Sequence, residues 1–379
     1  MTTRQIIKEV INQSLGFISR LEIKNEFQLF ERSEPTPYAR CFIIFIRALC
    51  KDTNWIEQKR AILNEDLNLD FNKFYHVRKS QNQELKFDKP ILQLLCFTLS
   101  ALYIIRGELN FENQQIVKDY LNSDIKDDLI KRGVFLGAPG SGNYAMFRAV
   151  ISYYSMHTMT IDCGSQITDW INLHLKNVNK NGYWGPSNTM QYLHFQNGYH
   201  QYEIFEALGV SEAPWTLAAG NTAIFADELG HFAPYPGGGG CYDYDAIFML
   251  TSPFVTDIGQ SEAVKLTLKT ILSEQNIDGG FCESKLLRTH SGSPRPFALI
   301  SHVLKQPAQT RTTSTISGLN LYRSKHRCVW THWCETDRFW DESNAWDTYF
   351  RLLLVARASK FLKCPGAELF KINDFPGIG

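Results

Sequence analysis

Three segments of the chain share one pattern of polar and apolar positions. Each has a variable residue, then an aromatic residue, then an acid, and continues as a mostly apolar stretch; they cover residues 201–208, 243–250 and 345–352. An acid in the first turn suits the positive end of a helix. The pattern therefore predicts three equivalent helices. Their opening pairs are Tyr202 with Glu203, Tyr244 with Asp245, and Trp346 with Asp347.

Four further segments repeat the pattern in a weaker form. Two begin with an aromatic residue, Tyr38 or Tyr144, and lack the acid, while two begin with Pro90 or Pro296 and lack both. Proline is expected at a helix start, because its missing N–H would have no partner there. The seven opening positions are separated by 52, 54, 58, 42, 52 and 50 residues. This period indicates a repeat built from a helix, a turn and a second helix.

Other stretches with helical spacing lie between these segments and would supply the second helix of each unit. They cover residues 6–20, 55–64, 113–121, 165–175, 215–228 and 264–273, while the polar stretch 71–89 is predicted to be a surface loop. Two alternating sets of helices predict an all-α fold, an (α/α) toroid of six to seven helical hairpins. Neighbouring repeats would share one core, so residues 1–379 are expected to form a single domain.

Composition and charge restrict the class of protein. The 379 residues are 44% hydrophobic, and Lys plus Arg equals Asp plus Glu at 39 each, which fits a soluble globular protein without a nucleic-acid partner. The apolar runs are shorter than the roughly 20 residues of a transmembrane segment, and peripheral membrane contact stays open. Nine cysteines without a Cys-x-x-Cys pair, and a start that reads as an amphipathic helix, favour a cytoplasmic protein with reduced thiols. The oligomeric state is left open.

One motif resembles a known family. Residues 275–281, Gln-Asn-Ile-Asp-Gly-Gly-Phe, resemble the Gln-x-x-Asp-Gly-(Gly/Ser)-(Trp/Phe) repeat of the squalene cyclase and protein prenyltransferase β-subunit superfamily. Gly-Tyr-Trp-Gly at 182–185 looks like a degenerate copy, and residues 239–250 resemble the unit's Gly-Gly and Asp ahead of an apolar helix. In such a motif Gln and Asp can tie a helix end to the next loop, Gly permits a tight turn, and the aromatic ring fills the gap between hairpins. The resemblance implies a terpenoid cyclase-like toroid.

Two departures from the superfamily's motifs bear on the reaction. Class II terpene cyclases carry Asp-x-Asp-Asp with a proton-donating middle Asp, whereas this chain has Asp243-Tyr244-Asp245-Ala246. Protein prenyltransferases bind zinc with an Asp, a Cys two residues later and a distant His, and no Asp-x-Cys occurs here. Zinc-dependent prenyl transfer is therefore not expected, and a cyclase of this kind would work without a cofactor.

The repeated acids are the first candidates for chemistry. In a toroid the inner helices converge on one mouth, so Glu203, Asp245 and Asp347 would face a common cavity together with Asp243. Crowded carboxylates raise one another's pKa, which can leave a protonated acid beside an ionised partner. Asp245 is the preferred general acid and Asp243 the second choice. The alternative is that each acid only caps its helix.

Other residues near the predicted mouth complete the candidate site. Aromatic side chains there would stabilise a carbocation or stack on a sugar ring. The alternative is that these aromatic residues are ordinary core residues. The histidines would act as a base or a hydrogen-bond donor, unless they are structural loop residues. Segment 332–342, rich in acids and aromatics, is expected to be a lid, with a divalent metal such as Mg²⁺ bound there as the less favoured alternative. The candidates are His200 and His231, the aromatic residues Tyr38, Tyr144, Tyr202, Tyr244 and Trp346, and the polar contacts Gln201 and Arg351.

Three functions fit this interpretation. The leading one is a cyclase-type lyase or isomerase that protonates an isoprenoid or similar apolar substrate through Asp245 and keeps the cation away from water. The second is a carbohydrate-active enzyme, an inverting glycosidase or polysaccharide lyase acting on a sugar, because the mouth carries many polar side chains. The third is a non-catalytic binding module on the same fold. Separated carboxyl groups across an open groove would favour the second function, and a closed aromatic pocket the first.

Overall fold

The structure, a computed structural model, is mostly α-helical. It describes residues 1–81, 87–187, 190–287, 295–306, 308–323, 328–329, 332–373 and 375–377. Helices make up 63% of it, with 15 α-helices among these described residues. Strands are confined there to two antiparallel pairs, β1 (Glu22–Ile23) with β2 (Glu26–Phe27) and β3 (Cys328–Val329) with β4 (Arg338–Phe339). The prediction of an all-α fold is confirmed.

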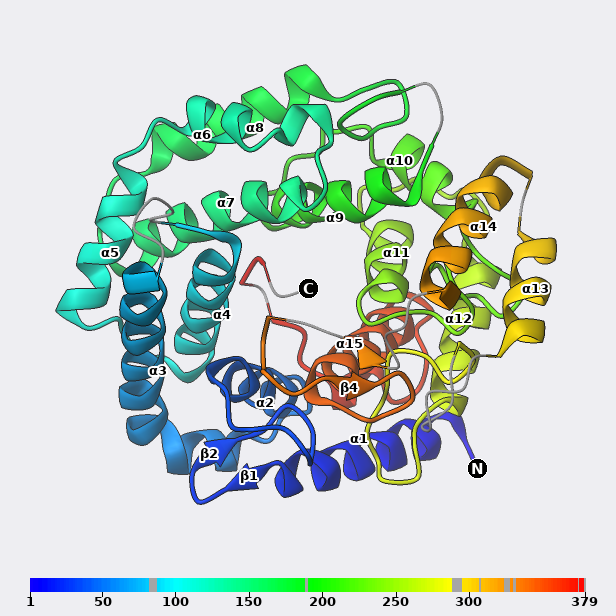
Figure 1. Ribbon diagram of the computed structural model, residues 1–379, viewed down its shortest axis with the longest axis horizontal. Coiled ribbons are helices and arrows are strands. Elements are labelled where there is room, and N and C mark those ends of the chain that lie inside the picture. Colours follow the sequence, from blue (N-terminus) through cyan, green and yellow to red (C-terminus); the bar gives the residue numbers. More distant parts are fainter. Residues whose placement is uncertain are drawn as a thin grey trace.

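Six helices form one continuous series of contacts. α2 packs on α4, α4 on α7, α7 on α9, α9 on α11, α11 on α15, and α15 on α2. Figure 1 shows these helices nearer the centre of the view than the others. The bounds of these central helices are α2 (Pro37–Leu49), α4 (Lys89–Ile105), α7 (Ser141–Thr158), α9 (Tyr192–Ala207), α11 (Tyr242–Thr251) and α15 (Ala345–Phe361).

A second set of helices packs outside the first (Figure 1). α1 contacts α2, α12 and α15; α3 contacts α2 and α4; α5, α6 and α8 contact α7; and α10 and α12 contact α11. α13 packs on α14. The bounds are α1 (Thr3–Arg20), α3 (Thr53–Gln81), α5 (Phe111–Leu121), α6 (Ile125–Lys131), α8 (Gly164–Asn177), α10 (Trp215–Ala223), α12 (Ser261–Ser273), α13 (Pro296–Lys305) and α14 (Ala308–Arg323), with 3₁₀ turns η1 (Val134–Leu136) and η2 (Ala367–Leu369).

The two sets differ in how much of each helix is buried. In α4 every residue from Ile91 to Leu102 is buried, whereas α1 buries one stripe, which includes Ile7, Val10 and Ile18. A helix that is apolar on all sides must lie between other elements, and an amphipathic helix covers them. The hydrophobic pattern thus distinguishes the central helix α4 from the covering helix α1. None of the described helices combines the length and the apolar character that crossing a bilayer requires.

Two predicted boundaries and one predicted position in the fold are wrong. α3 continues to Gln81 through much of the predicted loop 71–89, because Phe71 and Tyr75 are buried on its inner side; residues 82–86 lie outside the described residues. α9 begins at Tyr192, well before Tyr202, and this earlier stretch packs between α7 and α11. The helix predicted at Pro296, α13, packs on α14 and does not belong to the central series.

The turn at residues 275–281 has the contacts predicted from its sequence. Gln275 Nε2 donates to the backbone oxygens of Gly279 (2.8 Å) and Val10 (3.0 Å), which joins the end of α12 to α1. Asp278 Oδ1 accepts a backbone N–H within the turn (3.0 Å), and Gly279 has a φ of +89°, which favours glycine. Phe281 is buried in the main core. The motif therefore ties a late hairpin to the first helix of the chain.

Two other turns have the same backbone geometry. In each, a backbone N–H donates to the oxygen four residues later, and a glycine with positive φ donates back to the first residue. The three turns follow α8, α10 and α12, about one repeat period apart. Their first residues and glycines are Asn179 with Gly182, Asp227 with Gly230, and Asn276 with Gly279. The sequence pattern predicted the first and third turns but missed the second.

Candidate functional site

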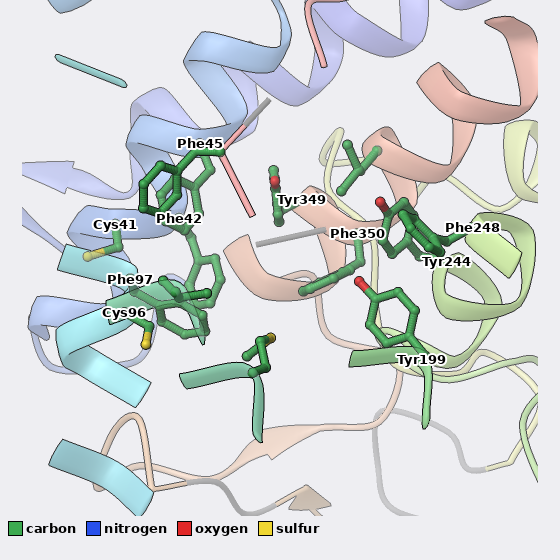
Figure 2. Close-up of a cluster of buried hydrophobic side chains, with 14 of the residues drawn as sticks. Cys41, Phe42, Phe45, Cys96, Phe97, Tyr199, Tyr244, Phe248, Tyr349 and Phe350 are labelled. Carbon is green, nitrogen blue, oxygen red and sulfur yellow. The ribbon is translucent and has the colours of Figure 1, made fainter. Parts of the chain in front are cut away.

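A cavity of about 200 Å³ with aromatic walls lies among the six central helices, all of which contribute to its lining. Phe42, Phe45 and Phe97 form one side, and Tyr199 and Phe350 lie across from them (Figure 2). Most of this wall is buried. A dry cavity of about 150 Å³ already accepts benzene, so this one can hold a small apolar molecule or one end of a longer one. The apolar lining is completed by Met146, Trp333, Trp346 and Tyr349.

Polar side chains line the same cavity. Most come from the central helices α4, α7, α9 and α11, and one precedes α11. The candidates His200, Glu203 and Asp245 are among them, as Trp346 is among the aromatic residues. The full polar set is Lys89, Gln93, Asn143, Gln196, His200, Glu203, Cys241 and Asp245.

Asp245 lies in the first turn of α11 with its carboxyl group fully buried. Within the described residues neither of its carboxyl oxygens has a hydrogen-bond partner. Burial raises the pKa of Asp245 well above its usual range, the negative charge of Glu203 raises it further, and the nearby side chain of Cys241 lowers it. Burial and the charge of Glu203 therefore both favour the protonated form of Asp245 at the cavity wall.

Glu203 borders the cavity from α9. Its Oε1 accepts the backbone N–H of Gly377 (2.9 Å), so the C-terminal segment reaches the cavity lining. Glu203 also lines a second hollow of about 690 Å³, together with Arg357 and Phe375. It lies near the end of α9 and not in the first turn, where the sequence pattern predicted it.

Asp243 precedes Asp245 by two residues and belongs to a separate charged cluster. Its Oδ2 accepts hydrogen bonds from His231 Nδ1 (2.8 Å) and from Arg351, and its Oδ1 accepts the N–H of Phe232 (2.7 Å). Burial would raise the pKa of Asp243, but the positive charges of His231 and Arg351 outweigh burial and lower the pKa to about 2. Asp243 therefore carries a negative charge and has no proton to donate at neutral pH.

His231 is the cation that bridges this cluster. Its Nε2 lies 2.9 Å from Glu274 Oε1, and its Nδ1 contacts Asp243. Burial would lower the pKa of His231, but the two carboxylates outweigh it and raise the pKa to about 10. Both ring nitrogens then act as donors. His231 and Arg351 are held in this ionic network, away from the cavity lining.

Asp347 lies in the first turn of α15 beside a second buried cluster. Its N–H donates to Asn344 Oδ1 (2.9 Å), and Arg338 Nε lies 3.6 Å from its Oδ2. Arg338 also donates to Glu283 (2.7 Å). Burial, and next the negative charge of Glu283, raise the pKa of Asp347 to about 7 against the charge of Arg338. Of the three repeated acids, Glu203 and Asp245 line the cavity, and Asp347 lies outside its lining.

Four of the five predicted wall aromatics lie away from the cavity surface. The hydroxyls of Tyr38 and Tyr202 donate to backbone oxygens in the core (2.8 and 2.6 Å), and Tyr144 is half-buried. Tyr244 lies behind the lining, with its ring centroid 6.0 Å from that of Tyr199 (Figure 2). Tyr244 therefore supports the wall from behind.

His200 and Gln201 are neighbours on α9 with different surroundings. His200 lines the cavity, its Nε2 lies 2.9 Å from the Asn143 amide, and burial followed by the charge of Lys89 lowers its pKa to about 3. His200 is therefore neutral. Gln201 is buried with its amide against the backbone oxygens of α9, including that of Gly198.

The predicted lid contributes to the cavity wall. Trp333 lines the cavity, with its ring centroid 4.0 Å from that of Trp346, and His332 Nε2 lies 2.7 Å from Gln93 Oε1. Within the part of the chain that the structure describes, no group of three or more His, Cys, Asp or Glu side chains is placed to hold a metal ion.

Several lining residues were missed in the sequence although a usable signal existed. Phe42 and Phe350 follow the opening aromatics Tyr38 and Trp346 by one helical turn, and Tyr199 precedes Glu203 by one turn. Residues one turn apart share a helix face. Examining the residues one helical turn from each patterned position would have identified them.

No protein-family model matches this chain, and no curated protein shows significant sequence similarity to it. A function can therefore be inferred only from the geometry of the cavity and the chemistry of its lining.

Proposed function

We propose that this protein is a proton-initiated cyclase, a lyase or isomerase in which Asp245 protonates an apolar, isoprenoid-like substrate in the aromatic cavity. One observation carries the proposal: Asp245 is a buried acid with a strongly raised pKa and without a hydrogen-bond partner among the described residues, and it lies at an aromatic wall. A raised pKa favours the protonated form of the acid, which can then donate its proton to a bound substrate.

We also propose that the chain is an (α/α) toroid of six hairpins in one domain. The cyclic order of contacts among the six central helices supports this architecture. Six pairs of a covering and a central helix follow one another along the chain: α1 with α2, α3 with α4, α5 with α7, α8 with α9 through the rings of Trp170 and Phe205, α10 with α11, and α12 with α15. The three equivalent turns after α8, α10 and α12 support the resemblance to the squalene cyclase and prenyltransferase superfamily.

The proposed reaction begins with transfer of the Asp245 proton to a carbon–carbon double bond. A C–H bond forms, the π bond breaks, and the positive charge passes to the neighbouring carbon. A second double bond of the substrate attacks this carbon and closes a ring. The faces of Phe42, Trp346 and Phe350 would stabilise the cation without trapping it as water would.

Removal of a proton ends the reaction. Glu203 is the proposed base, because it lines the same cavity and influences the pKa of Asp245. The product is then an isomer of the substrate, since one proton is added and one is lost. Passing the acquired proton from Glu203 to Asp245 restores the starting state.

The walls of the cavity favour this function over a carbohydrate-active enzyme. Aromatic side chains form a mostly buried wall of the cavity, whereas inverting glycosidases place a water between two carboxyl groups that flank the sugar. Asp243, the ionised acid of α11, is ion-paired with Arg351 and His231 and lies outside the cavity lining.

The test is turnover of acyclic isoprenoids that end in a double bond, carried out in D₂O with a metal chelator present. We expect a cyclic isomer that contains one deuterium, detected by mass spectrometry. Asp245→Asn should reduce the rate by about a hundred-fold or more, because the amide cannot donate an acidic proton. A rate that requires magnesium, or that survives Asp245→Asn, would reject the proposal.

Two controls separate chemistry from damage to the fold. Asp169→Asn changes an exposed acid on α8 and should leave the rate unchanged. Quenching of tryptophan fluorescence by the substrate, reported by Trp333 and Trp346, should persist in Asp245→Asn. Loss of both turnover and quenching in Asp245→Asn would mean that Asp245 maintains the cavity, and would contradict its assignment as the acid.

A further inference from the structure

One part of the cavity lining is polar and is not explained by the cyclisation chemistry. Lys89, the first residue of α4, lines the cavity together with Gln93 one turn later, Asn143 of α7, and Gln196 and His200 of α9. An apolar substrate gains nothing from burying these groups. Their presence points to a polar group on the molecule that binds here.

Lys89 is the charged member of this set. Burial lowers the pKa of Lys89, and within the described residues no carboxylate forms an ion pair with its ammonium group. The preceding residue, Asp88, is paired with Arg78 (2.6 Å). A half-buried cation without a protein anion is unfavourable unless a ligand supplies the opposite charge.

The neighbours of Lys89 are neutral. Burial, and next the charge of Lys89, lower the pKa of His200 to about 3 and that of His332 to about 4, so neither ring is protonated at neutral pH. The amide groups of Gln93 and Asn143 contact these rings at 2.7 and 2.9 Å. This part of the lining therefore offers one full positive charge surrounded by neutral polar groups.

We propose that the ligand of this cavity is an amphipathic monocarboxylate, whose carboxylate pairs with Lys89 and whose apolar body lies along the aromatic wall. This inference rests on the proposed function, which places the reacting double bond at Asp245. Lys89 and Asp245 come from different helices, α4 and α11, that both border the cavity. The carboxylate fixes one end of the molecule and so determines which double bond meets the acid.

The charge of this region favours a carboxylate over a diphosphate. One lysine offsets a single negative charge, whereas a diphosphate carries more. The additional charge would remain uncompensated in a partly buried site, which is strongly unfavourable. A diphosphate would require further cations beside Lys89, and the neutral state of His200 and His332 does not supply them.

The test measures binding in the Asp245→Asn protein, where no turnover consumes the ligand. The probes are citronellic acid, the matching alcohol citronellol, and citronellyl diphosphate, followed by quenching of tryptophan fluorescence. We expect the acid to bind about ten- to a hundred-fold more tightly than the alcohol, as for a hydrogen-bonded charge pair. Adding Lys89→Met should remove this advantage and leave the affinity for citronellol within about twofold.

Matched variants and probes make the outcome decisive. Lys126→Met, at an exposed position of α6, should keep the preference for the acid. Equal binding of acid and alcohol, tighter binding of the diphosphate than of the acid, or equal weakening of both ligands by Lys89→Met would overturn the inference. If the preference for the acid depends on Lys89 but no isoprenoid is cyclised, the carboxylate site stands and the proton-initiated reaction is rejected.

Discussion

Asp245 on α11 and Glu203 on α9 line one cavity from adjacent helices, and the negative charge of Glu203 raises the pKa of Asp245. The two acids differ in their hydrogen bonding. Asp245 has no hydrogen-bond partner among the described residues, while Glu203 accepts the N–H of Gly377. An arrangement of this kind holds a proton on one acid and negative charge on its neighbour.

Removing the charge of Glu203 should therefore lower the pKa of Asp245. Glu203→Gln keeps an oxygen that can accept the N–H of Gly377, so the change is mainly electrostatic. The protonated carboxyl stretch of Asp245, identified by its loss in Asp245→Asn, should disappear at a lower pH in Glu203→Gln than in the wild-type protein. Infrared titration measures this shift. An unchanged titration would show that burial alone sets the pKa of Asp245.

Replacing each of the two acids of α11 by Asn should change the free energy of unfolding to very different extents. Asp243→Asn leaves the buried charges of Arg351 and His231 without their anion and should cost about 3–5 kcal/mol of unfolding free energy at pH 7. Asp245→Asn replaces a neutral, unpaired carboxyl group with a neutral amide and should change stability by at most about 1 kcal/mol. Urea denaturation of both variants provides the comparison. Equal losses would contradict the division of roles between the two acids.

The sequence was sufficient to predict most of the helices and two of the three equivalent turns, because these depend on local pattern. Residues 275–281 carry their hydrogen-bonding groups within the motif, so the roles of Gln275, Asp278 and Gly279 followed from residue type. The start of α9 was not predictable in this way. Its N-cap, Gln191, makes no side-chain capping bond, and the helix before Tyr202 packs between α7 and α11.

The candidate site was predictable only in part, because the state of each acid depends on residues distant in the sequence. Asp243 and Asp245 are two residues apart and have similar sequence surroundings. Their charge states differ because Asp243 pairs with His231 and Arg351. The cation Lys89 was also missed. It opens a helix that lacks the aromatic and acidic marks, and its position at the cavity follows from packing between helices.

The raised pKa of Asp347 predicts that the free energy of unfolding depends on pH between about pH 4 and pH 7. Its pKa is about 7 in the folded protein and about 3.9 in an unfolded chain, so the folded state binds the proton more tightly. Stability linked to this proton is present below about pH 4 and is lost as pH rises toward 7. Asp347→Asn should lack this loss, so its stability relative to wild type should increase across the window.

Chemical denaturation at several pH values measures this effect. Asp169→Asn, an exposed control, should follow the wild-type pH profile. A constant difference between Asp347→Asn and wild type from pH 4 to 7 would show that Asp347 binds its proton equally in the folded and unfolded states, and would contradict the raised pKa.

The position of the C-terminal segment should depend on the absence of a side chain at Gly377. This residue has a φ of +93°, and a Cβ there would lie 2.3 Å from Val150 Cγ2 on α7. Gly377→Ala should displace the segment and break the hydrogen bond to Glu203, which opens this side of the cavity to water. Hydrogen exchange of the Gly377 amide and of nearby α9 amides should become faster.

Two further variants separate the clash from the backbone effect. Gly209 also has a positive φ, +70°, but a Cβ there would meet no atom of the described residues within 4 Å, so Gly209→Ala should cost only the left-handed backbone penalty of about 1–2 kcal/mol. Val150→Ala removes Cγ2 and should restore slow exchange in the Gly377→Ala protein, a positive coupling between the two sites. If Val150→Ala does not restore slow amide exchange in the Gly377→Ala protein, contact with α7 does not position the segment. The hydrogen bond from Gly377 to Glu203 then does not depend on packing against Val150.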